Sequence, residues 1–198
     1  MNTQETQMSP AEIAEILNDF VRKMVLNPKA VQITTTVRSS FALFTIKTDQ
    51  ADARRVIGSG GRHFMALETI AGALARRISM EARLVLDEQF QPFALPTVKA
   101  AWLATSNAEA PCNLKELLTR TLMPFVEDVD AFEVIDTDLG KTTLVEINVT
   151  AADYPAIYGA EVMFGYGLDG RLIGSIKNLV DGIGKNHGKL VHVVISHK

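Results

Sequence analysis

A short run of glycines with arginines on both sides is the part of this sequence best suited to bind a ligand. The run Gly58-Ser59-Gly60-Gly61 follows Arg54 and Arg55 and precedes Arg62 and His63. Glycine has no Cβ, so a ligand can approach its backbone closely, and the amides that open a helix attract anions. Arginine adds a planar fork of donors that fits a phosphate. The segment predicts a phosphate-binding turn, the alternative being a plain bend between two helices.

The elements that position this turn follow from the spacing of apolar residues around it. Helical spacing predicts an amphipathic helix over 11–26 and another from Arg62 to about Ile78. Alternation predicts strands, and Asp49 is placed to cap a short helix that ends at Ile57. The predicted order is helix 11–26, strand 31–37, strand 41–47, short helix 49–57, turn 58–61, helix 62–78 and strand 82–86. The glycines therefore join two helices, and the second helix begins directly after them.

The chain carries a second copy of this plan. When the sequence is shifted by 101 positions, residues 13–58 fall on residues 114–159, and ten of the 46 positions are identical. Chance gives roughly three identities over that length, so the match indicates an internal repeat. The final helix and strand align better at a shift near 106, which predicts about five extra residues around the second turn.

The second turn departs from the first in ways that weaken phosphate binding. A glycine pair with two residues between them survives as Gly167-Leu168-Asp169-Gly170, followed by Arg171. Leu168 is bulky, and Asp169 brings a negative charge to the place where a phosphate would lie. We interpret the second unit as degenerate, serving as a packing partner, a dimer surface or a protein-binding module.

The segment around the first turn, Val56-Ile57-Gly58-Ser59-Gly60-Gly61, resembles the KH-domain signature, a V/I-I-G-x-x-G core between two helices. The preceding helix and strand resemble the type II, prokaryotic arrangement. The first unit is similar to small stand-alone KH RNA-binding proteins of bacteria across almost all of 11–88. The pair is similar to the tandem KH units of the transcription factor NusA, without its S1-like barrel.

This resemblance implies an α+β fold of two type II KH-like units, each a three-stranded sheet covered by helices. It also implies a non-catalytic protein that binds single-stranded RNA, with single-stranded DNA as an alternative, holding about four nucleotides per module. The predicted RNA-binding residues are Arg54, Arg55, Ile57, Gly58, Ser59, Gly60, Gly61, Arg62 and His63.

Each neighbour of the glycines has a predicted role in that site. Ser59 can donate a hydroxyl hydrogen bond to a phosphate oxygen, and Ile57 can line an apolar groove. Because the helix before the turn is short, at least one of Val56 and Ile57 should face the core. His63 can stack on a base or donate a hydrogen bond, the alternative being an ordinary exposed histidine at a helix start.

Composition limits the remaining function classes. The chain has 198 residues, of which 47% are hydrophobic and 22% charged, values typical of a globular protein. No apolar run approaches the ~20 residues of a membrane span, and the first residues lack a signal pattern. The single cysteine, Cys112, fits a reducing cytoplasm. The net charge of −3 argues against binding by bulk charge, although eight of the ten arginines lie in residues 1–88.

Other motifs predict neither an enzyme nor a cofactor. The run Gly-Tyr-Gly-Leu-Asp-Gly at 165–170 matches a dinucleotide fingerprint in letters, but the required acidic residue and following strands are missing. His187, His192 and His197 lack a spacing suited to a shared metal ion, and Cys112 has no placed base. We therefore predict no catalytic residues, no metal site and no cofactor.

The sequence thus predicts three segments, namely a type II KH domain over 10–88, a linker over 89–112 and a degenerate KH-like domain over 113–198. The alternative function is a protein-interaction or dimerisation scaffold that no longer binds nucleic acid. A homodimer or a protein partner through the second unit also remains open.

Overall fold

The structure, a computed structural model, describes residues 8–87, 113–158 and 171–197. The first half contains α1 (Pro10–Met24), β1 (Gln32–Arg38), β2 (Phe41–Lys47), α2 (Gln50–Ile57), α3 (Arg62–Arg77) and β3 (Glu81–Leu86), with short 3-10 turns at Pro28–Ala30 and Ser59–Gly61. The second half contains α4 (Leu114–Leu122), a 3-10 turn at Met123–Phe125, β4 (Glu133–Asp138), β5 (Thr142–Val149), α5 (Tyr154–Tyr158), α6 (Arg171–Asn186) and β6 (Leu190–His197).

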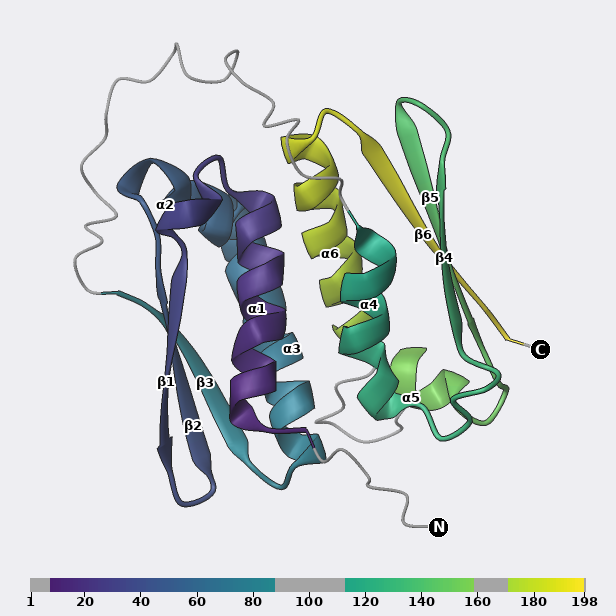
Figure 1. Cartoon of the computed structure of the whole chain (residues 1–198), viewed down its shortest axis with the longest axis horizontal. Helices are drawn as coiled ribbons and strands as arrows, with labels where there is room; N and C mark the ends of the chain where they lie inside the picture. Colours follow the sequence, from purple (N-terminus) through teal and green to yellow (C-terminus); the bar gives the residue numbers. More distant parts are fainter. Residues whose placement is uncertain (1–7, 88–112, 159–170, 198) are drawn as a thin grey trace.

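Each half forms a mixed three-stranded sheet with its helices on one face, which confirms the predicted α+β class. The middle strand pairs antiparallel with the strand before it and parallel with the last strand, in both halves. Figure 1 shows the sheets on opposite sides of the molecule, with α1 and α3 facing α4 and α6 between them. The buried side chains of both halves belong to one hydrophobic cluster.

Strand registers relate the two halves residue by residue. Phe41 pairs with Glu81 in the first sheet, and Thr142 pairs with Leu190 in the second. The middle strands are thus offset by 101 residues, as predicted, but the last strands are offset by 109. The predicted offset near 106 was wrong, because eight rather than five extra residues precede α6. These extra residues, the predicted second turn and the predicted linker lie outside the described residues.

Local sequence signals explain where the helices begin. Ser9 and Glu12 form a reciprocal capping box at the start of α1, and Pro10 occupies its first turn. Asp49 stands at the N-cap of α2, but its carboxylate accepts a hydrogen bond from Asn27 Nδ2 at 2.6 Å instead of capping the helix. The predicted side-chain cap at Asp49 is therefore wrong, although the predicted helix is present.

One buried aspartate in each half fixes the segment after the first helix. Asp52 is 1% exposed and accepts hydrogen bonds from the backbone N–H of Leu26 at 2.9 Å and of Asn27 at 2.8 Å. Asp153, 2% exposed, accepts equivalent bonds at 2.8 and 3.3 Å from the residues 101 positions further along. A buried carboxylate with such donors is satisfied, so these aspartates have a structural role that the repeat conserves internally.

The two halves pack through equivalent surfaces, as two copies related by a two-fold axis would. Arg77, the last residue of α3, donates through Nε to the carbonyl of Pro124 at 2.6 Å. Asn186, the last residue of α6, donates through Nδ2 to the carbonyl of Lys23 at 3.1 Å. Position 186 follows 77 by 109 residues and 124 follows 23 by 101, so each bond is the counterpart of the other. Such reciprocity is typical of a two-fold interface.

Candidate nucleic-acid interface

The turn between α2 and α3 has the backbone that its glycines predict. Gly58, Gly60 and Gly61 have φ angles of +73°, +62° and +79°, a region that residues with a Cβ rarely adopt. A Cβ placed on Gly60 or Gly61 would have no atom within 4 Å. The backbone angle, not crowding, therefore favours glycine at these two positions, and the space beside them is open to a ligand.

The exposed side of this turn offers donors to an anion. Ser59 and Gly60 are exposed, and no side chain caps the N-terminus of α3. Arg54 and Arg62 are also exposed, one on each side of the turn. Arg62 folds back over the turn, where its Nε donates to the Ser59 carbonyl at 3.2 Å. The structure thus brings together an open backbone, a helix N-terminus, a hydroxyl group and two guanidinium groups, a combination suited to phosphate.

The last two residues of α2 divide between core and surface. Val56 is fully buried, whereas Ile57 is only half-buried. This confirms the prediction that at least one of the pair faces the core. Ile57 keeps apolar surface next to the turn, and Met65 in the first turn of α3 is 63% exposed. The sequence analysis did not single out Met65, because an isolated methionine on a helix face predicts core more often than surface.

Arg55 and His63, in contrast, are engaged within the protein. Arg55 donates through Nη1 to Oδ1 of Asn186 at 3.1 Å, and its Nε lies 3.5 Å from Oδ1 of Asp52. Nδ1 of His63 lies 2.7 Å from the Arg55 carbonyl; a carbonyl only accepts, so Nδ1 carries the proton. The structure therefore places both residues at the contact between the halves, and their predicted contact with RNA stays a prediction.

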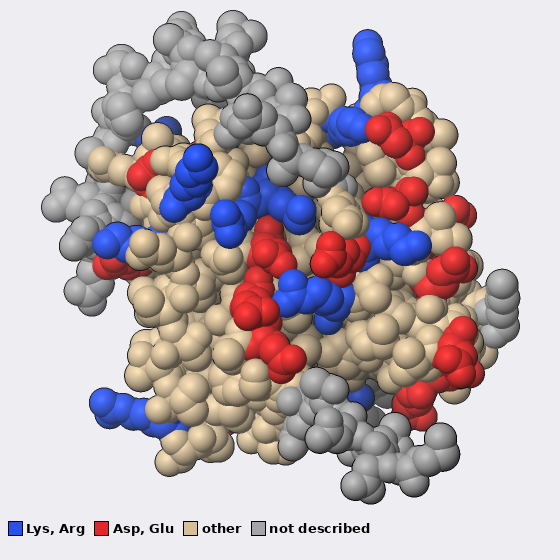
Figure 2. Space-filling model, in the orientation of Figure 1, with Lys and Arg blue, Asp and Glu red and all other residues tan. Residues whose placement is uncertain are grey.

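Two of the three remaining arginines of α3 and β3, Arg77 and Arg83, have partners within the protein, whereas Arg76 is exposed. Arg77 donates to Pro124 across the halves and lies 5.7 Å from the centre of the Phe125 ring. Arg83 forms an exposed ion pair with Glu68 at 3.4 Å. Figure 2 shows side chains of both charge signs next to one another over α1 and α4.

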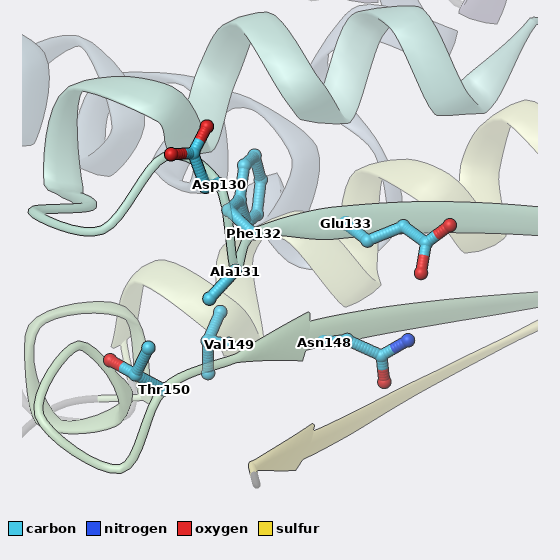
Figure 3. A pocket seen from close by; sticks show the side chains of 7 residues that line it. All are labelled: Asp130, Ala131, Phe132, Glu133, Asn148, Val149 and Thr150. Atoms are coloured by element: carbon cyan, nitrogen blue, oxygen red, sulfur yellow. The ribbon is translucent and has the colours of Figure 1, made fainter.

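The second half presents a different surface. A shallow hollow at the ends of β4 and β5 is lined by Asp130, Ala131, Phe132, Glu133, Asn148, Val149 and Thr150 (Figure 3). Its lining includes two carboxylates and no cation, so it does not suit a phosphate. The predicted turn at 167–170 lies outside the described residues.

The order of elements around the turn agrees with a comparison against known families. Residues 14–86 match the family model described as KhpA/KhpB, KH domain. This match includes the whole turn and nearly all of the first half, so the first half is similar to a KH domain. No curated protein matches the chain. Among the described residues, no helix has the length and apolar character that crossing a membrane requires.

Proposed function

We propose that the chain is a non-catalytic protein that binds single-stranded RNA through the glycine turn of its first KH unit. The observation that carries this proposal is the exposed turn itself, with three positive-φ glycines between Arg54 and Arg62, inside the segment that matches a KH family. KH modules hold the backbone of a few unpaired nucleotides on such a turn. Single-stranded DNA is the alternative ligand, because the turn would contact phosphates, which RNA and DNA have in common.

The proposed contacts divide into backbone and groove. Ser59 and Gly60 would present their amides, and Ser59 its hydroxyl group, to phosphate oxygens, while Arg54 and Arg62 would neutralise charge. The amides of Gly58 and Gly61 already donate to the carbonyls of Arg54 and Gly58, so these two glycines would contribute by letting the ligand approach the backbone closely. Ile57 would contact a base or ribose from the groove side. These few phosphate contacts give modest affinity and a shallow dependence on salt.

The second half completes the proposed tandem. Its strand registers and its buried Asp153 repeat those of the first half, which supports a second, degenerate type II KH-like unit. We place the units at 10–88 and 113–198, joined by a linker over 89–112, in a cytoplasmic protein of bacterial type. The second unit would serve as a packing partner for the first.

A titration with short random single-stranded RNAs at two salt concentrations tests the function. Binding in the micromolar range that weakens as salt rises is expected. The double variant S59D/G60D should abolish binding, because two carboxylates would repel phosphate from an exposed turn. The matched control S59N/G60N has nearly the same shape without the charge, and Asn and Asp both tolerate the left-handed backbone at position 60. Equal RNA affinity of both variants and the wild type would show that the turn is not the site.

The alternative is a protein-interaction scaffold that no longer binds nucleic acid. The net charge of −3 and the mixed charges over α1 and α4 (Figure 2) favour this second function. If no random single-stranded RNA binds at low salt, the scaffold function is favoured over RNA binding.

A further inference from the structure

The glycine turn of the first half is in contact with a helix of the second half through one imidazole ring. The ring of His63 packs so closely on Gly58 that a Cβ there would lie 2.5 Å from its Cγ. On its other side the same ring meets Gly182 of α6, where a Cβ would lie 2.7 Å from Cε1 and 2.8 Å from Nε2. Real Cβ atoms essentially never approach another atom this closely. The absence of a Cβ at Gly58 and at Gly182 therefore leaves room for the His63 ring between the turn and α6.

A second link joins α6 to the last turn of α2. Asn186 accepts a hydrogen bond from Arg55 Nη1 at 3.1 Å and donates to the carbonyls of Lys23 and Val25, each at 3.1 Å. Asn186 is buried, so its amide is held by three partners from the first half. The carbonyl of Arg55 in turn accepts from His63 at 2.7 Å. Arg55, His63 and Asn186 thus form one chain of hydrogen bonds from α6 to the start of α3.

From these contacts we infer that α6 of the second half holds the glycine turn in its binding conformation, with Gly182 and Asn186 as positioning residues. Three of the four residues in the turn are glycines, Gly58, Gly60 and Gly61, and their backbones lose entropy when they are ordered on a ligand. Contacts that order the turn beforehand remove part of that cost. The inference rests on the proposed RNA binding for its effect on affinity, but the contacts themselves can be tested without RNA.

Where the structure describes both halves, this arrangement has no counterpart at the other end of the molecule. At the offsets of the repeat, the second half has Leu172 in place of His63 and Ala156 in place of Arg55. The first half has Ala73 where α6 has Gly182. The symmetric counterpart therefore lacks the imidazole, the guanidinium group and the glycine. The second half has specialised as a support for the first turn.

The variant G182A tests the inference in the full chain. A methyl group at position 182 displaces the His63 ring, while alanine in a helix interior favours the helix and so offsets lost packing. We expect RNA affinity to fall by about five-fold, and the backbone amide NMR signals of Ser59, Gly60 and Gly61 to shift in the RNA-free protein. The matched control is G174A in the same helix, where a Cβ would have no atom within 4 Å; it should change neither quantity.

A double-mutant cycle identifies the ring as the link. In the H63A background the space beside Gly182 is open, so G182A should no longer affect the amide signals or the affinity. A second pair compares N186A with R77A, which remove equivalent contacts at opposite ends of the molecule. N186A should lower RNA affinity more than R77A at equal loss of thermal stability.

The outcomes separate this inference from the proposed function. If the wild type binds RNA and G182A leaves its affinity or the amide signals unchanged, the positioning role is overturned and RNA binding stands. If the wild type binds no RNA, the proposed function fails, and the amide signals alone decide whether α6 holds the turn. Equal RNA affinities of N186A and R77A at matched stability would also overturn the inference.

Discussion

Arg120 of α4 and Asp19 of α1 are separated by 101 residues, the offset of the repeat, and they form an ion pair with each other. Nη1 of Arg120 lies 2.9 Å from Oδ2 of Asp19, and Nη2 lies 3.1 Å from Oε2 of Glu15. In a two-fold interface, a residue that contacts its own counterpart lies at the axis. This position therefore marks the approximate axis between the halves. Two identical units would bring two like charges together at this axis, whereas this chain has Arg120 facing Asp19.

Charge reversal at this axis should destabilise the pairing of the halves. The variant R120D would place three carboxylates side by side, with a repulsion of about 1 kcal/mol per close pair in water. We expect a lower midpoint of thermal unfolding, measured by circular dichroism. The swapped variant D19R/R120D should recover most of the loss, because it restores opposite charges. K115D, a charge reversal at an exposed position of α4, is the control. An R120D variant as stable as K115D would show that the pair contributes nothing.

A fragment of residues 8–87 should not remain a well-folded monomer. In the full chain α3 packs along α6, and the buried residues of both halves form one cluster. Removal of the second half exposes that apolar face of α1 and α3 to water, which costs about 25 cal/mol for each Å². Light scattering should therefore show self-association, or circular dichroism a loss of helix. A monomeric fragment with the full chain's unfolding midpoint would mean that the halves are independent.

Acid should weaken the fold through Asp153. The backbone N–H of Glu127 is the main cause that lowers the pKa of Asp153 below its ordinary value, helped by the Thr150 hydroxyl and opposed by burial. Since the folded-state pKa is depressed, this stabilisation is present above the unfolded pKa of about 3.8 and is lost as the pH falls through the folded value.

Urea unfolding at several pH values checks this effect with D153N. The amide cannot offer two acceptor oxygens to three donors, so D153N should lower the urea midpoint at pH 7 and flatten its fall below pH 4. A D153N midpoint that follows the wild type at every pH would exclude the role of this carboxylate.

His187 should make the stability of the fold depend on pH in a range above that of Asp153, below about pH 6.5. Burial is the main cause that lowers the pKa of His187 from 6.5, and the charges of Lys23 and Lys189 lower it further. Below pH 6.5 the unfolded chain takes up a proton that the folded chain still excludes, so stability falls as the pH drops from 6.5 toward the folded value. H187I, which introduces the residue found at the equivalent position Ile78, should reduce this slope. An unchanged slope in H187I would assign the pH dependence to other groups.

The sequence by itself determined the features that arise from neighbours along the chain. Apolar spacing predicted α1 and α3, alternation predicted the strands, and Gly58, Gly60 and Gly61 marked a turn whose positive φ angles the structure confirms. The repeat was also readable, since Asp52 and Asp153 stand at the same offset and have the same backbone partners. These signals are local, because a helix, a strand or a turn is specified mainly by residues within a few positions.

Only the tertiary structure decided which side chains at the turn are free to meet a ligand. Arg54 and Arg55 are indistinguishable in sequence, yet the first is exposed and the second bonds to Asn186. Gly182 and Gly184 stand close together in a helix without predicting a site, and the role of Gly182 depends on the His63 ring that packs against it. The physical reason is that the packing of α6 on the first half brings together residues more than one hundred positions apart. No spacing within either half specifies that contact.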